Sequence, residues 1–240
     1  MADHTVKSYE SELALLDKRI AHMGGLAEQI LGQSFQALER RDPHMAEAVV
    51  KADRAIDMLQ REIEEQAVFM IARRQPMADD LRHIIGALRI TGDLERVGDL
   101  AKNTAKRALA IAHEQPPKPL ISGLRHMVEL AMRQLKDVLD AYAERDAEKA
   151  MKVWREDEQI DAMYNSLFRE LLTYMMEDPR NIGLSTHLLF GAKNVERVGD
   201  HTTNIAETIA YLVQGTAITD ERPKGDDTSS TPITGRDDRA

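Results

Sequence analysis

The sequence predicts an all-α fold made of two tandem repeats of an up-down-up three-helix bundle. Composition is the first indication. Of the 240 residues, 4% are aromatic and 42% hydrophobic, and Ala, Leu, Glu, Lys, Arg and Met are abundant, as in long amphipathic helices. Apolar residues also recur at intervals of three and four, the spacing of one helix face. The third observation is a five-residue motif, Glu-Arg-Val-Gly-Asp, that occurs at 95–99 and again at 196–200.

The first half is expected to contain three helices. An apolar stripe over residues 9–38 predicts the first. Asp42 followed by Pro43 is a start signal, an N-cap acceptor before a proline in the first turn, and the second helix is expected to run to about residue 74. A third helix is expected over about 78–112, and the prolines within 116–119 then break the chain.

The second half repeats this plan. Helices are expected over about 120–144, from a cap at Asp146 to about residue 177, and over about 182–213, with a turn at 178–179. The segment 41–57, which includes the cap of the second helix, recurs 104 residues later. Internal duplication explains such an ordered recurrence better than chance does.

The helices define two repeats and a tail. We expect the first three-helix repeat over residues 5–115, the second over 116–214, and a disordered acidic tail over 215–240. The last segment combines Thr, Ser, Asp and Gly with two prolines and almost no large apolar residue. Such a segment cannot offset the entropy lost on ordering.

Charge and cysteine content exclude several classes of function. The formal net charge is −9, which disfavours nucleic-acid binding because that needs a basic surface. No cysteine is present, so disulfides, zinc-thiolate sites, iron–sulfur clusters and thiol catalysis are excluded. No apolar run approaches the roughly 18 residues of a membrane span, and the first residues lack a signal-peptide core. A cytoplasmic protein without a membrane span is expected.

Pairs of acidic residues four positions apart recur on the predicted hairpins. Such a pair lies about one turn apart on one helix face, where like charges weaken a helix by a few tenths of a kcal/mol unless a cation or donor neutralises them. Each five-residue motif supplies one pair, and the helix before it supplies another. The pairs are Glu95 with Asp99, Glu196 with Asp200, Asp53 with Asp57, and Asp157 with Asp161.

The hairpins are expected to bring these pairs to the same height. Residues of an antiparallel hairpin are level when they are equally distant from its turn. By that rule Asp53 is level with Asp99, and Asp57 with Glu95, about a turn at Pro76. The two acidic pairs of the second half stand in the same relation about their own turn.

Carboxylates that converge on one patch cannot all stay ionised without a counter-charge. A bound cation is one candidate, and oxygen ligands suit hard ions such as magnesium, calcium, manganese or iron better than a structural zinc. The alternative is that the acids lie on solvated faces and pair with Lys or Arg, which are frequent in a chain that is 30% charged. Spacing alone leaves both interpretations open.

Other residues near the motif are weaker candidates. Asn103 and Asn204 lie four residues beyond the Asp of each copy, where an amide could orient a carboxylate from outside the metal shell. Gly98 and Gly199 are unfavourable in a helix interior and are expected where a neighbouring helix or a ligand approaches closely. His201 directly follows the second motif and is expected to point away from the acidic face.

The motif and its surroundings, Asp93 to Asp99 with Asn103 and Val195 to Glu207, resemble the two signature helices of the PhoU family. The resemblance covers residues 5–214. It implies a cytoplasmic accessory of the phosphate-specific ABC transporter, usually a homodimer, that represses the phosphate-starvation response. In that role the protein acts between the transporter ATPase and a membrane sensor histidine kinase, and so lies at the inner membrane through its partners.

The resemblance also implies metal binding. Glu/Asp-x-x-x-Asp motifs of the family hold multinuclear clusters, iron or zinc in some members, and the pairs within 95–99 and 196–200 match them. The acids of the preceding helices fit the same pattern less closely. Manganese and magnesium stay open on ligand chemistry. Asn194 stands where the first half has Asp93, so the two clusters are expected to differ in occupancy.

Three functions are consistent with these features. The first is a metal-binding signalling adaptor without catalysis, the second a metalloenzyme of the di-iron carboxylate or phosphate-hydrolase type, and the third a helical scaffold with solvated acids. The sequence has no Glu-x-x-His pair, Walker loop, His-Glu-x-x-His or Gly-x-Ser-x-Gly motif. The adaptor is therefore preferred to the enzyme.

Overall fold

The computed structural model describes residues 2–216 and 218, and every regular element among them is a helix. The predicted all-α fold is confirmed. The tail expected over 215–240 lies, apart from its first residues, outside the described part of the chain. The elements are α1 (Ala2–Arg40), α2 (Pro43–Arg74), α3 (Asp79–Ala110), α4 (Lys118–Glu144), α5 (Ala147–Glu156), α6 (Glu158–Glu177), the short 3₁₀ turn η1 (Pro179–Asn181) and α7 (Ile182–Gln214).

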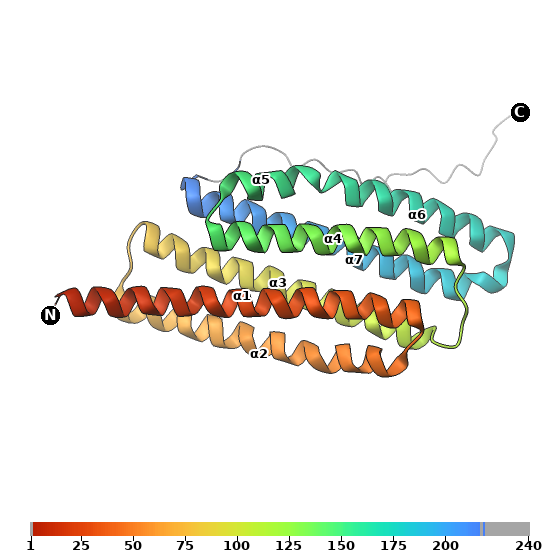
Figure 1. The fold of residues 1–240 in the computed structure, drawn as a ribbon, viewed down its shortest axis with the longest axis horizontal. Coiled ribbons are helices and arrows are strands. Elements are labelled where there is room, and N and C mark those ends of the chain that lie inside the picture. Colours follow the sequence, from red (N-terminus) through yellow and green to blue (C-terminus); the bar gives the residue numbers. More distant parts are fainter. Residues whose placement is uncertain (1, 217, 219–240) are drawn as a thin grey trace, which may run out of the picture.

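The helices form two layers. Figure 1 shows α1, α2 and α3 lying lengthwise beside one another, with α4 to α7 along them as the second layer. The layers meet where α3 packs against α7 and α1 against α4. Together with the packing inside each layer, these contacts enclose one continuous apolar core. Within residues 2–216, no helix is both long and apolar enough to cross a membrane.

The starts of α2 and α5 show the duplication in detail. The Asp42 carboxylate accepts the N–H of His44 at 2.9 Å, and Pro43 stands in the first turn of α2, as the start signal predicts. Asp146 caps α5 in a similar way, accepting the N–H of Lys149 at 3.0 Å. Equivalent residues therefore start equivalent helices in the two repeats.

The helix expected from the cap at Asp146 to residue 177 is divided at Asp157 into α5 and α6, so the prediction of one unbroken helix is wrong at this point. The Asp157 backbone stays helical, with φ −59° and ψ −36°, but its carbonyl accepts the Ile160 N–H at 2.9 Å in a tighter turn. The Glu156 carbonyl instead accepts the side chain of Gln134 in α4, whose Nε2 lies 2.9 Å away. A buried amide from another helix thus stabilises the break.

Candidate functional site

The acidic residues of the first repeat lie at the predicted register. A Cβ built on Gly98 in α3 would lie 2.9 Å from Cδ1 of Ile56 and 3.2 Å from Oδ1 of Asp53, both in α2. Only a glycine lets α2 approach α3 this closely without displacing these side chains. The expected close approach at Gly98 is confirmed, and it brings Asp53 beside the motif.

The second repeat has the same arrangement. A Cβ on Gly199 in α7 would lie 2.9 Å from Oδ1 of Asp157 and 3.0 Å from Cδ1 of Ile160. The register and the reason for the glycine therefore hold in both halves. Each motif lies against the acidic residue that the hairpin rule predicts.

A lysine neutralises part of the first acidic cluster, which we define as Asp53, Asp57, Glu95 and Asp99. Lys102 Nζ lies 2.5 Å from Oδ2 of Asp53 and also bonds to Asp99. Asp53 is only 2% exposed. Burial, together with the charges of Asp57 and Asp99, raises its pKa despite the opposing hydrogen bond and charge of Lys102. Burial would lower the pKa of Lys102, but its hydrogen bonds to the two carboxylates outweigh burial and raise that pKa.

The pKa of Glu95 shows that the four carboxylates of the first cluster share one electrostatic environment. Burial raises this pKa most, and the negative charges of Asp99, Asp57 and Asp53 raise it further. Arg96 lowers it in part, through an ion pair of 3.5 Å in which the arginine is 60% exposed. The cluster therefore carries more negative charge than Lys102 and Arg96 balance.

The second acidic cluster, Asp157, Asp161, Glu196 and Asp200, is more deeply buried. Asp157 is 1% exposed, Asp161 4% and Glu196 5%. Lys193 Nζ lies 2.9 Å from Oε1 of Glu196. At the position equivalent to Lys102 stands Thr203, and its hydroxyl donates to the Asp200 carbonyl at 2.8 Å. The counter-charge thus comes from a different side of the motif.

The donor chemistry of both clusters fits a cation, but the side chains are not gathered around one point. Two carboxylates with raised pKa values in the first cluster and three buried carboxylates in the second are suited to hard metal ions. Within residues 2–216, no three or more carboxylate or imidazole side chains are arranged to hold one metal ion. In the first cluster, a metal ion that binds Asp53 and Asp99 has to displace Lys102.

The residues expected beside the clusters lie between α3 and α7. The Nδ2 of Asn204 donates to Oδ1 of Asp93 at 3.2 Å, and the His201 Nδ1 lies 2.8 Å from the same oxygen. Asn103 lines a cavity together with Asn194. The Asp93/Asn194 difference, expected to change metal occupancy, therefore lies at the contact between the two repeats, where Asp93 bonds to α7.

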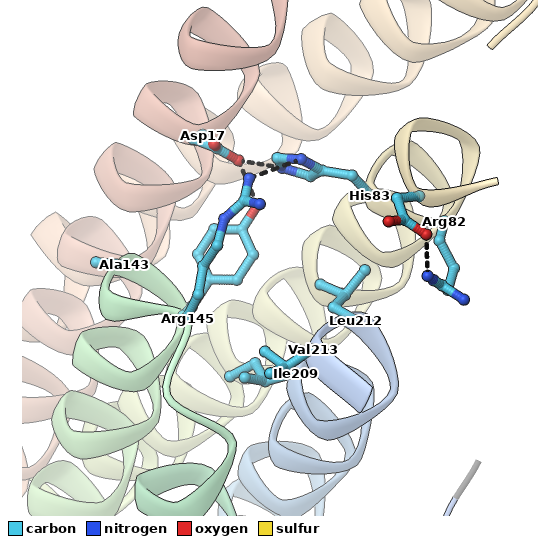
Figure 2. Close-up of a pocket in the computed structure, with 10 residues that line it drawn as sticks. Asp17, Arg82, His83, Ala143, Arg145, Ile209, Leu212 and Val213 are labelled. Carbon is cyan, nitrogen blue, oxygen red and sulfur yellow. Dashed lines mark hydrogen bonds and ion pairs between the residues drawn. The ribbon is translucent and has the colours of Figure 1, made fainter. Parts of the chain in front are cut away.

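A second polar site was not predicted from the sequence. A cavity of about 300 Å³ lies where α1, α3, α4 and α7 meet, and Figure 2 shows the side chains that line it. His83 Nε2 lies 2.7 Å from Oδ1 of Asp17, and the Tyr142 hydroxyl donates to the same oxygen at 2.6 Å. Arg145 Nη2 lies 3.0 Å from His83 Nδ1. Since a guanidinium only donates, Nδ1 accepts and Nε2–H donates to the carboxylate.

This network joins the two repeats, because Asp17 and His83 belong to the first and Tyr142 and Arg145 to the second. Burial would raise the pKa of Asp17, but the hydrogen bonds from His83 and Tyr142 hold it below its usual range. Only one feature of the sequence pointed to this network: Asp17, a carboxylate four residues after Leu13, on the apolar stripe of the first helix. Its partners come from other helices and left no local pattern.

Comparisons with known sequences agree with the repeat. The PhoU domain matches the chain twice, over residues 20–108 and 124–209. The chain is 56% identical over 227 residues to the phosphate-specific transport system accessory protein PhoU homolog of Rhizobium meliloti (strain 1021), a match that covers 95% of this chain and 96% of the relative. It is 52% identical over 226 residues to the homolog of that name from Caulobacter vibrioides (strain NA1000 / CB15N), covering 94% and 98% respectively.

Solved structures share the fold. A crystal structure of PhoU from Pseudomonas aeruginosa matches with a TM-score of 0.84 at 38% identity, over 87% of this chain and 100% of that one. The phosphate transport system regulatory protein PhoU from Streptococcus pneumoniae matches with a TM-score of 0.81 at 31% identity, over 88% and 99%. With the motif and the close-packed glycine in both repeats, these matches show that the chain belongs to the PhoU family.

Proposed function

We propose that this protein is an accessory of a phosphate-specific transport system that regulates phosphate uptake and represses the phosphate-starvation response. The observation that carries the proposal is the match along 95% of the chain to a relative named as an accessory protein of a phosphate-specific transport system. The repeated motif and its buried acids, which occur in both halves, support a regulator that uses both repeats. We propose that the protein has no catalytic activity of its own.

We propose that both acidic clusters bind metal ions. Glu95 and Asp99, with Asp53 and Asp57, would hold them in the first repeat, and the four equivalent acids would do so in the second. Iron, zinc, manganese or magnesium would supply a multivalent positive charge that holds two helices together. The buried carboxylates and the raised pKa values of Asp53 and Glu95 support this.

We propose that the partners are the ATPase of a phosphate-specific ABC transporter and a membrane sensor histidine kinase, and that the protein acts as a homodimeric adaptor between them on the cytoplasmic side. Support comes from the names of the relatives, which assign them to a transport system. Attachment to the membrane through partners also suits a chain in which no described helix can cross a bilayer.

Deletion of the gene tests the regulatory role. In phosphate-rich medium the deletion strain should express phosphate-starvation genes at the level of starved wild-type cells, and the wild-type gene supplied in trans should restore repression. Unchanged expression in the deletion strain contradicts the proposed function.

Elemental analysis of protein purified without chelator or affinity-column metal tests the clusters. Wild-type protein should retain metal, whereas the paired variants Glu95→Ala with Asp99→Ala, or Glu196→Ala with Asp200→Ala, should each lose the share held by one repeat. Glu64→Ala with Glu65→Ala, two exposed acids of α2, is the matched control. Metal-free wild-type protein, or equal metal content in all variants, refutes metal binding at these residues.

A further inference from the structure

A second cavity, of about 360 Å³, lies between α3 and α7. The residues that line it are all of polar or charged types, with two cations and no carboxylate among them, although the chain as a whole has a net charge of −9. A local surplus of positive charge in an acidic protein is the opposite of what its average composition gives. The lining residues are Asn103, Lys106, Arg107, His187 and Asn194.

Arg107 is held in place by its neighbours, and part of its guanidinium is not hydrogen-bonded within the described chain. Its guanidinium lies over the ring of Phe190, 4.3 Å from the centroid, and Nη1 lies 3.5 Å from Nδ1 of His187. Its Nε is buried and bonds to no residue of the described chain. Because a guanidinium only donates, His187 Nδ1 accepts, and in the neutral ring Nε2 carries the proton and is free to serve as another donor.

The internal repeat explains why this cavity has no acid of its own. α3 and α7 are equivalent helices that pack against each other. At one end of their contact, Asp93 accepts from His201 and Asn204. At the other end the equivalent position, 101 residues later, is Asn194, whose Nδ2 donates to Oγ1 of Thr104 at 3.2 Å. One end therefore has a built-in carboxylate and the other an amide.

We infer that the cavity between α3 and α7 binds a small tetrahedral oxyanion of the phosphate or sulfate class. Arg107 can donate two parallel hydrogen bonds to such an ion, and Lys106 adds a second positive charge. The amides of Asn103 and Asn194 add neutral donors and acceptors around it. The anion would occupy the electrostatic role that Asp93 fills at the other end. This inference does not depend on metal binding at the acidic clusters.

Isothermal titration calorimetry of the full-length protein with inorganic phosphate, at constant ionic strength, tests the inference. Saturable binding of about one phosphate per chain is expected, and Arg107→Gln should weaken it at least about tenfold. Arg89→Gln is the matched control, because Arg89 makes the corresponding stack on Tyr211, 5.6 Å from its centroid, outside the cavity. Equal weakening in both variants would mean diffuse charge attraction and would overturn the site.

Asn194→Asp gives an independent test. It places a carboxylate in the cavity, at the position equivalent to Asp93, with almost no change in the shape of the side chain. Phosphate affinity should fall at least about tenfold, while circular dichroism and melting temperature show an intact fold. A sulfate titration separates the two ligands: equal affinity indicates recognition of the tetrahedral dianion, and a preference for phosphate indicates that an amide oxygen accepts its proton. Absence of saturable binding of either anion, or unchanged affinity in Asn194→Asp, refutes the inference.

Discussion

The two acidic clusters have the same carboxylates at the same register but differ in what neutralises them. In the first, Lys102 bonds to both Asp53 and Asp99. In the second, Thr203 replaces that lysine, and Lys193, which precedes the motif, contacts Glu196 instead. Helix register thus sets where the carboxylates lie, whereas single neighbouring side chains set their counter-charge.

Burial also distinguishes the clusters. In the first only Asp53 is nearly inaccessible, at 2%, whereas in the second Asp157, Asp161 and Glu196 are all exposed by 5% or less. A cation entering the first cluster competes with Lys102 for two carboxylates. In the second, Lys193 contacts Glu196. We therefore expect charged groups to affect stability differently in the two clusters, and four changes test how the two repeats differ.

Lys102→Thr gives the first cluster the residue of the second and should have the largest effect. Without Lys102 the buried Asp53 lacks its bonded cation, and metal-free protein at pH 7 should lose about 2–3 kcal/mol of unfolding free energy, less than for a fully buried pair because Lys102 is partly exposed. The melting temperature should fall by about 4–10 °C. Added metal should restore it, since the competing ammonium is gone.

Lys136→Thr is the control for that change. Lys136 bonds to Asp140 at 2.7 Å on the surface, where such a pair contributes about 0.5 kcal/mol or less. Thermal melting with and without chelator measures both variants. Equal, small shifts would show that Lys102 is no more than a surface ion-pair partner.

Gln134→Leu tests why the second repeat has a broken helix. Ile30 occupies the equivalent position in the first repeat, where α2 is continuous. Loss of the amide leaves the Glu156 carbonyl without its donor, at a cost of about 1–3 kcal/mol. Removing Oε1, which has no partner in the described chain, offsets part of this. A net loss of about 1 kcal/mol is expected, seen as a melting temperature about 2–4 °C lower.

The exposed Gln115 provides the control, since Gln115→Leu removes an amide that lies on the surface. An unchanged melting temperature in Gln134→Leu would mean that the break persists without the amide. The side chain would then follow the break and not stabilise it. Metal content of the same variant shows whether the position of Asp157 depends on the break.

Local signals explain why most of the fold could be predicted. Asp42 and Pro43 start a helix through their own hydrogen bonding and geometry. Equal distance from a turn then placed Asp53 beside the motif, and Gly98 shows that contact directly. Heights along a hairpin depend only on rise per residue, so a sequence suffices to calculate them.

The features that could not be predicted depend on which way a side chain points around its helix axis and on contacts with other helices. The angular position of a lysine around its helix decides whether it reaches the acids. Nothing near Lys102 or Lys193 in the sequence distinguishes these two from exposed lysines. Gln134 breaks a helix to which it does not belong. His83 and Arg145 meet only because the two repeats pack together. Such contacts have no local pattern, and only the packed structure defines them.

Glu95→Gln should have the smallest effect and the opposite sign. Burial and three nearby carboxylates raise the pKa of Glu95. Its protonated form therefore favours folding below the unfolded-state pKa of about 4.3, and this contribution is lost as pH rises through the higher folded-state pKa. At pH 7 the ionised Glu95 destabilises metal-free protein. Glutamine should raise its melting temperature by about 1–2 °C, for about 0.5 kcal/mol, with no gain near pH 4.

The equivalent change in the second cluster, Glu196→Gln, completes the comparison. It removes the charged partner of Lys193, which lies 2.9 Å from Oε1 of Glu196, so the relief of acid repulsion is opposed by loss of a charge-assisted hydrogen bond worth about 1.5–3 kcal/mol. We expect no stabilisation at pH 7. If Glu196→Gln stabilises metal-free protein as much as Glu95→Gln does, Lys193 does not neutralise its cluster, and the two repeats differ less than their counter-charges indicate.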